Sequence, residues 1–169
     1  MIDRRVLLSS VAVLGGLMAF RWLRASDANA AGEGKTFEVQ KSADEWRKQL
    51  SPAAYNVLRE HGTERPFTSP LDKEKRKGTF ACAGCDLPLF ASETKFDSGT
   101  GWPSFYQHLP DAIGTTVDRS FLMVRTEVHC RRCGGHLGHV FEDGPKPTGL
   151  RYCMNGVSLA FKPSDAQPS

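Results

Sequence analysis

The sequence predicts a single, mainly β domain of the α+β class, with short helices at its N-terminal end. The chain of 169 residues, 40% of them hydrophobic, is long enough to bury one core and short for two. Helix-start signals lie between residues 42 and 62, and after residue 78 the apolar residues come in short runs broken by glycine and proline. This change of pattern predicts helices first and a mostly antiparallel β body after them.

Two serines mark the expected helix starts. Ser42 and Glu45 match a capping box, in which each side chain accepts a hydrogen bond from the backbone N–H of the other residue. A first helix should therefore run to about residue 50. Ser51 followed by Pro52 opens a second helix, because the first turn does not use the N–H that proline lacks, and Gly62 is a natural stop.

Five apolar runs are expected to form strands. They are rich in β-branched and aromatic residues and are bounded by turn-forming or polar residues, as strands commonly are. The runs are 79–82, 87–90, 121–129, 137–141 and 157–161.

The N-terminal segment has the layout of a secretory signal peptide. Arg4 and Arg5 precede an apolar stretch at 6–20, and Ala28-Asn29-Ala30 resembles a cleavage site. The paired arginines favour the twin-arginine type of bacterial signal. We therefore predict a signal peptide at 1–30, a linker at 31–41, the folded domain at 42–163 and a flexible tail at 164–169.

Export to the periplasm or another extracytoplasmic compartment of a bacterium follows from this layout. The alternatives are a general secretory signal with a chance arginine pair, and an uncleaved membrane anchor. The apolar stretch spans 15 residues, whereas a membrane-spanning helix needs about 20, so no stable membrane association is expected after cleavage. The net charge of +3 is scattered over the chain, which predicts no nucleic-acid partner, and a monomer is the expected state.

Two C-x-x-C pairs predict a structural zinc site. Cys82 with Cys85 and Cys130 with Cys133 can each present two thiolates, and four thiolates fill a tetrahedral zinc site without leaving a position for water. The 44 residues between the pairs exceed the spacing of a zinc finger, so the ion would tie together two distant hairpin turns. The alternative is a pair of disulfides, which an oxidising compartment would favour.

The fifth cysteine, Cys153, is a candidate nucleophile. Arg151 and Asn155 would lie on the same side of an extended strand, where a cation favours the thiolate and an amide can donate a hydrogen bond. The alternative is a buried structural cysteine, which is common in cores.

Two further segments carry candidate site residues. His136 and His139 lie in segment 136–144, where a histidine can protonate a leaving oxygen and a nearby carboxylate can orient it. The alternatives are a polar surface turn or a second metal site, for which no third ligand is evident. Trp102, in segment 98–105, can form the wall of an apolar socket, although an aromatic plug in the core would show the same pattern.

Taken together, these segments resemble the methionine-R-sulfoxide reductase (MsrB) family. The resemblance extends from about residue 45 to 161, and rests on both C-x-x-C pairs, segments 98–105 and 136–144, and Arg151-Tyr152-Cys153-Met154-Asn155-Gly156. It implies a fold of two antiparallel β-sheets with one structural Zn²⁺ ion. It also implies an oxidoreductase that reduces the R epimer of methionine sulfoxide in proteins.

The resemblance further implies roles for single residues. Cys153 matches the family's nucleophile, and Trp102 matches the wall that holds the substrate methyl group. The polar active-site groups that match are His136, His139, Asp143, Arg151 and Asn155. A thiolate attack on the sulfoxide sulfur, with protonation of the oxygen by a histidine, would release methionine and leave a sulfenic acid.

Position 100 departs from many members of the family, which carry a second, resolving cysteine there. This chain has Thr100, and its other cysteines are assigned to zinc. The sequence therefore predicts a one-cysteine enzyme that depends on an external thiol, such as a thioredoxin-like protein.

Two other functions remain open at this point. A zinc-ribbon-like binding module without catalysis would explain the four paired cysteines and leave Cys153 without a role. A general thiol–disulfide oxidoreductase would use one C-x-x-C pair, but neither pair precedes the helix that normally activates such a cysteine.

Overall fold

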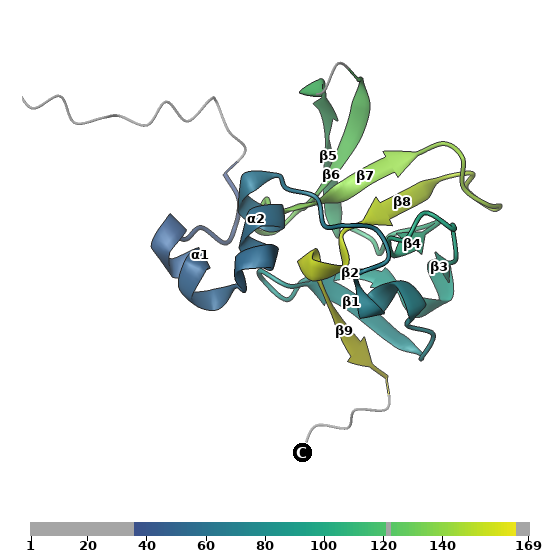
Figure 1. Ribbon diagram of the computed structural model, residues 1–169, viewed down its shortest axis with the longest axis horizontal. Coiled ribbons are helices and arrows are strands. Elements are labelled where there is room, and N and C mark those ends of the chain that lie inside the picture. The colour runs from purple at the N-terminus through teal and green to yellow at the C-terminus, as the bar shows by residue number, and fades with distance from the viewer. Residues whose placement is uncertain (1–35, 121–122, 165–169) are drawn as a thin grey trace, which may run out of the picture. The chain divides into compact units, whose positions relative to one another are not determined.

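The structure is a computed structural model that describes residues 36–120 and 123–164 (Figure 1). Within these ranges the chain forms the helices α1 (Ala43–Gln49) and α2 (Pro52–Glu60) and the 3-10 turns η1 (Pro70–Lys73), η2 (Ser92–Thr94) and η4 (Gly156–Ser158). The strands are β1 (Gly78–Cys82), β2 (Pro88–Ala91), β3 (Lys95–Phe96), β4 (Ser104–Phe105), β5 (Ile113–Asp118), β6 (Arg125–Cys130), β7 (His136–Phe141), β8 (Arg151–Met154) and β9 (Leu159–Pro163).

Both helices begin where the sequence predicts. The capping box of α1 is present, since Ser42 Oγ accepts from the N–H of Glu45 and the Glu45 carboxylate accepts from the N–H of Ser42. Helix α2 has Ser51 as its N-cap. Its end differs from the prediction, because His61, rather than Gly62, takes the left-handed conformation with φ 55°.

The expected strands at 79–82, 87–90 and 137–141 correspond to β1, β2 and β7. The run at 121–129 corresponds to β6, although its first two residues lie outside the described ranges. The run at 157–161 is only partly correct, because the turn η4 precedes β9. Strand β5 was not predicted; it alternates polar and apolar residues weakly and its middle is exposed.

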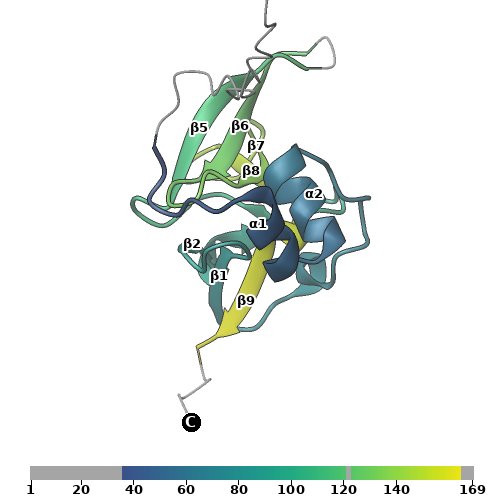
Figure 2. The same ribbon diagram turned by 90° about the vertical axis from the view of Figure 1, so that its left-hand side faces the viewer.

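The strands form two antiparallel sheets, as the resemblance implied. One has the order β2-β1-β9 and the other the order β3-β4-β8-β7-β6-β5. Figures 1 and 2 both show β5 to β8 above β1, β2 and β9, with the two helices alongside the region where the sheets come together. The pairing in every ladder is antiparallel.

One hydrophobic core joins the helices to both sheets. Trp46 of α1 and Leu58 of α2 are buried in the same cluster as the strand residues. Phe90 of β2 stacks on Phe105 of β4 with ring centroids 4.4 Å apart, and Phe80 of β1 meets Phe105 edge-on at 4.9 Å. Aromatic contacts of this kind fix the two sheets against each other, because each ring buries a large apolar area.

The predicted signal peptide, the first part of the linker and nearly all of the tail lie outside the described residues. The end of the linker is bound to the domain, since the N–H of Val39 donates to the carbonyl of Arg132 at 3.0 Å. Across 36–120 and 123–164, the helices are too short or too polar to cross a bilayer.

Candidate active site and metal centre

Cys153 faces a cavity of about 220 Å³. Four of the residues predicted from the sequence meet here, namely Cys153, His139, Asn155 and Trp102. The complete lining is Thr63, Trp102, Arg125, Gly138, His139, Phe141, Cys153 and Asn155.

The register of the six-stranded sheet places the thiol among polar side chains. Cys153 of β8 stands directly opposite Ser104 of β4 on one side and His139 of β7 on the other, and His139 stands opposite Glu127 of β6. Directly opposite residues in an antiparallel sheet share a face, so these four form one row. Gly138 permits the close approach of β7 to β8, since a Cβ there would lie 2.1 Å from the carbonyl oxygen of Cys153.

A β-bulge brings the second histidine to this face. In a regular strand, residues three apart point to opposite faces. The register of β6 and β7 shifts between Val128 and His129, and a bulge of this kind re-aims the side chains around it. The rings of His136 and His139 consequently lie 5.4 Å apart between centroids.

Each of these histidines has a carboxylate partner that the sequence analysis did not identify. The Nε2 atom of His139 lies 2.9 Å from Oδ2 of Asp118, which also accepts from Nη2 of Arg125 at 2.6 Å. The Nδ1 atom of His136 lies 2.7 Å from Oε1 of Glu127. The expectation of a carboxylate from segment 136–144 is therefore corrected: the partners come from β5 and β6, through strand pairing.

Both carboxylates are ionised at neutral pH. Hydrogen bonds from Ser120, followed by that from His139, hold the pKa of Asp118 well below its usual range. The hydrogen bond from His136 is the largest reason that the pKa of Glu127 also lies far below its usual range. Burial lowers the pKa of His139, and its bond to Asp118 acts in the opposite direction. The protonated form of His139 therefore depends on the negative charge of Asp118.

The thiol of Cys153 is in contact with hydroxyl groups. Burial raises the pKa of this thiol, whereas Thr100, Arg151 and Ser104 act to lower it. Thr100 Oγ1 lies 3.9 Å from Cys153 Sγ. Ser98 Oγ bonds to both Thr100 Oγ1 and Ser104 Oγ, at 2.8 and 2.7 Å. The three hydroxyls form a connected chain that can hold a hydrogen bond toward the sulfur.

Arg151 and Asp143 lie beside the cavity and are not part of its lining. The Nε and Nη2 atoms of Arg151 each lie 2.8 Å from one carboxylate oxygen of Asp143. The guanidinium carbon lies 4.4 Å from the ring centroid of Phe141. This bidentate pair, stacked on an aromatic ring, fixes the cation next to Cys153 on the same face of β8.

Glu64 holds two sides of the cavity and was missed by the sequence analysis. Its carbonyl accepts from Nε1 of Trp102 at 3.1 Å, and its N–H donates to Oδ1 of Asn155 at 2.9 Å. Nδ2 of Asn155 donates to the carbonyl of Leu137 at 3.1 Å. The Asn155 amide thus connects β8 to the coil at Glu64 and to β7 at Leu137. Asn155 makes these contacts in place of the expected hydrogen bond to Cys153, since β8 ends at Met154.

Little in the sequence marks Glu64 or Asp118 as site residues. Glu64 follows α2 in a coil, and Asp118 ends a strand that was not predicted. Arg125 and Glu127 could have been found, because charged residues two positions apart lie on one face of a predicted strand.

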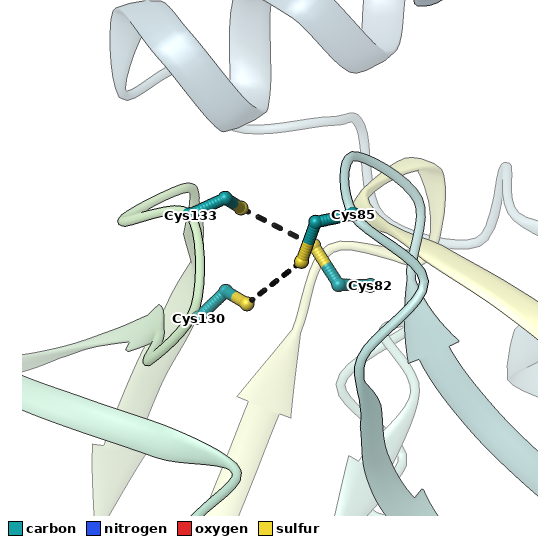
Figure 3. Close-up of side chains that lie close together, drawn as sticks. All are labelled: Cys82, Cys85, Cys130 and Cys133. Atoms are coloured by element: carbon teal, nitrogen blue, oxygen red, sulfur yellow. Dashed lines mark hydrogen bonds between the residues drawn. The ribbon is translucent and has the colours of Figure 1, made fainter. Parts of the chain in front are cut away.

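The four paired cysteines form a compact cluster (Figure 3). The sulfurs of Cys82 and Cys133 lie 3.7 Å apart, those of Cys85 and Cys130 lie 3.4 Å apart, and all four lie within 4.8 Å of one another. A Zn–S bond of about 2.3 Å places tetrahedral ligands about 3.8 Å apart, so the cluster has the size of a four-thiolate metal site. All four are free cysteines, which argues against the disulfide alternative.

This cluster connects the two sheets. The first pair begins at the last residue of β1 and the second at the last residue of β6. The close contacts run between the two pairs, as Figure 3 shows. Four cysteine side chains this close together can ionise to thiolates only if a cation balances their charge.

The chain is similar to one group of known proteins. The SelR domain family matches residues 50–163. The peptide methionine sulfoxide reductase MsrB of Agrobacterium fabrum is 58% identical over 127 residues, which cover 75% of this chain and 94% of that protein. The protein of the same name from Pseudomonas putida strain W619 is 59% identical over 129 residues, covering 76% and 97%. That of Methanosarcina barkeri is 58% identical over 125 residues, covering 73% and 88%.

Proposed function

The chain belongs to the SelR family of peptide methionine sulfoxide reductases, MsrB, and we propose that it reduces the R epimer of methionine sulfoxide in proteins through Cys153. It is an oxidoreductase whose substrate is oxidised methionine in polypeptides. One observation carries the residue assignment. The single cysteine outside the four-cysteine cluster faces a cavity that it shares with His139 and Trp102.

The first step transfers oxygen from the substrate sulfur to Cys153. The Cys153 thiolate attacks the sulfoxide sulfur while His139 donates a proton to the oxygen. The hydroxyl group then passes to Cys153 Sγ as the bond between the two sulfurs and the S–O bond of the substrate break, so that methionine leaves as the thioether and Cys153 becomes a sulfenic acid. The ionised Asp118 keeps His139 oriented and favours its protonated form. His136 and its partner Glu127 pack behind His139 and position it.

Trp102 and Phe141 supply the apolar part of the cavity, where the substrate methyl group binds. Arg151, fixed by Asp143, stabilises the thiolate against the effect of burial. Asn155 and Glu64 hold the cavity wall in place through their shared hydrogen bonds.

Regeneration requires two external thiols. The first attacks the sulfenic acid, which releases water and forms a mixed disulfide with Cys153. The second releases Cys153 and leaves the reductant as a disulfide. Thr100 contacts Cys153 but has no thiol with which to form a disulfide. A thioredoxin-like protein or a small thiol therefore reduces the sulfenic acid.

The four-cysteine cluster fits one Zn²⁺ ion. Zinc prefers thiolates in tetrahedral geometry, and Cys82, Cys85, Cys130 and Cys133 would hold it. A bound ion would link the two sheets, and the redox steps would take place at Cys153.

The N-terminal segment supports export through a twin-arginine-type signal to a compartment outside the bacterial cytoplasm. Fractionation of cells that express the full chain tests this. Replacement of Arg4 and Arg5 by lysine should leave the protein in the cytoplasmic fraction, and unchanged export of that variant would instead indicate the general secretory route.

The decisive test of the function uses the full-length, zinc-loaded chain and separate R and S epimers of a peptide methionine sulfoxide, with dithiothreitol as reductant. Only the R epimer should be reduced. Cys153→Ser should keep the zinc and the melting temperature and lose all turnover. Turnover by that variant would refute the nucleophile, and turnover of the S epimer alone would refute the proposed stereochemistry.

A further inference from the structure

A second group of metal-ligand side chains lies beside the Cys153 cavity. The Nδ1 atoms of His61 and His136 lie 3.1 and 2.7 Å from the same oxygen, Oε1 of Glu127. The three ligand atoms lie within 4.8 Å of one another. The sequence offered no third ligand for His136 and His139; in the fold, the second imidazole comes from the C-terminal end of α2 instead.

Solvent reaches this group through a cleft of about 470 Å³. The His61 side chain is 65% exposed, whereas those of Glu127 and His136 are 12% and 3% exposed. The charged lining consists of the carboxylates Glu60, Asp118 and Glu127 and the guanidiniums Arg119 and Arg125. The lining has one more carboxylate than guanidinium, so its fixed charges do not repel a cation.

The geometry requires only a small opening to take a metal ion. Zn–N and Zn–O bonds of about 2.0–2.1 Å place tetrahedral ligands about 3.4 Å apart. The contacts of His136 and His61 with Glu127, at 2.7 and 3.1 Å, fall short of this by less than 1 Å. His61 can move outward because it is exposed. The ion would replace the direct contacts between the imidazoles and the carboxylate.

We propose that His61, Glu127 and His136 form a second site for a divalent transition metal such as Zn²⁺, and that occupancy of this site inhibits the enzyme. Two imidazoles and one carboxylate are the ligand set of many zinc sites with an open coordination position. The inhibitory part rests on the function proposed above, whereas the binding part does not.

Inhibition follows from the position of the site. The His136 ring lies 5.4 Å from that of His139. To reach ligand distance, the Glu127 carboxylate and the His136 imidazole must move apart by less than 1 Å. Because His136 packs against His139, this movement would displace the ring that must reach the substrate oxygen.

Binding is tested by calorimetric titration of Zn²⁺ into the protein that already holds one zinc per chain, in a Cys153→Ser background so that no free thiol competes. One further equivalent should bind. His61→Asn removes the imidazole but suits the left-handed conformation at φ 55°. It should weaken binding by more than the roughly 10–100-fold typical for loss of an outer-shell partner. Glu60→Gln removes a cleft charge and no ligand of the site, and should bind nearly as tightly as the parent.

Absence of a further equivalent, or equal affinity in the His61→Asn protein, overturns the proposed site. A loss in Glu60→Gln as large as in His61→Asn would show general attraction to a charged cleft and would overturn it as well.

The inhibitory effect is tested in the background with Cys153 intact. Added Zn²⁺ should inhibit methionine sulfoxide reduction in the parent and Glu60→Gln proteins, and should do so only at higher concentration in His61→Asn. Equal inhibition of all three would place the effect on the Cys153 thiol and refute this part. Inactivity of the parent without added Zn²⁺ would refute the proposed function instead, and would leave the binding result standing.

Discussion

Replacement of Gly138 by alanine tests the claim that strand register creates the active site. A Cβ at this position would lie 2.1 Å from the carbonyl oxygen of Cys153 and 3.0 Å from Cα of Met154. Ordinary contact begins at about 3.4 Å, so β7 and β8 must separate by more than 1 Å. The atoms in the way belong to the backbone and cannot rotate aside.

Two effects of Gly138→Ala can be estimated. Overpacking of this kind typically lowers the free energy of unfolding by about 1–3 kcal/mol. A misplacement of about 1 Å between reacting groups can lower the rate about 100-fold, which corresponds to about 2.7 kcal/mol of transition-state stabilisation. We therefore expect kcat/KM for the R epimer to fall about 100-fold, because His139 moves away from Cys153.

Gly149→Ala provides the matched control. Gly149 has φ 72°, and no atom beyond its chain neighbours lies within 4 Å of its Cβ position, so its substitution costs about 1–2 kcal/mol of backbone strain without a clash against another part of the chain. Urea unfolding and steady-state kinetics of both zinc-loaded variants give the comparison. The reasoning is refuted if Gly138→Ala retains the parent kcat/KM, or if Gly149→Ala loses as much activity at equal stability loss.

Thr100→Cys should create a resolving thiol, because Thr100 Oγ1 lies 3.9 Å from Cys153 Sγ. After reaction with substrate in the absence of reductant, mass spectrometry should find an internal disulfide; a persistent sulfenic acid would contradict this. Arg151→Gln should shift the pH dependence of Cys153 alkylation by iodoacetamide to higher pH. Burial raises the pKa of this thiol and the guanidinium lowers it, so loss of the guanidinium reduces the thiolate fraction at any given pH. An unchanged pH dependence of alkylation would argue against the effect of Arg151 on Cys153. Removal of zinc should unfold the domain, since structural zinc contributes about 10–16 kcal/mol in zinc-finger peptides and small domains have only about 5–15 kcal/mol in all. Circular dichroism during chelation measures the loss of secondary structure, and the Cys85→Ser variant should also be unfolded. A metal-free protein that keeps its fold would refute the structural role of zinc.

The helix starts could be predicted because their signals are local. Ser42 and Glu45 are three residues apart, and the capping box they form is complete within one turn. The C-cap of helix α2 is His61, one residue before the predicted Gly62, and His61 adopts the left-handed conformation. Gly62 itself has no left-handed φ, and the nearest atom to a Cβ there, Oδ1 of Asn56 at 1.9 Å, belongs to an exposed side chain.

The two-residue strands β3 and β4 and the polar strand β5 were beyond prediction. Such strands form by pairing with residues distant in the sequence, as Ser104 pairs with Cys153. Intrinsic strand preference is too weak to mark them.

The sequence by itself determined the residues with reactive chemistry, namely the four paired cysteines, Cys153 and the histidines, because thiol and imidazole groups are recognisable wherever they stand. The export signal is likewise read from sequence and stays a prediction. Only the tertiary structure decided which carboxylate is hydrogen-bonded to which histidine. Asp118 reaches His139, and Glu127 reaches His136, through strand register and a bulge. Register is a property of the packed sheet, in which a shift of one residue would turn every side chain to the other face, and no local pattern encodes it.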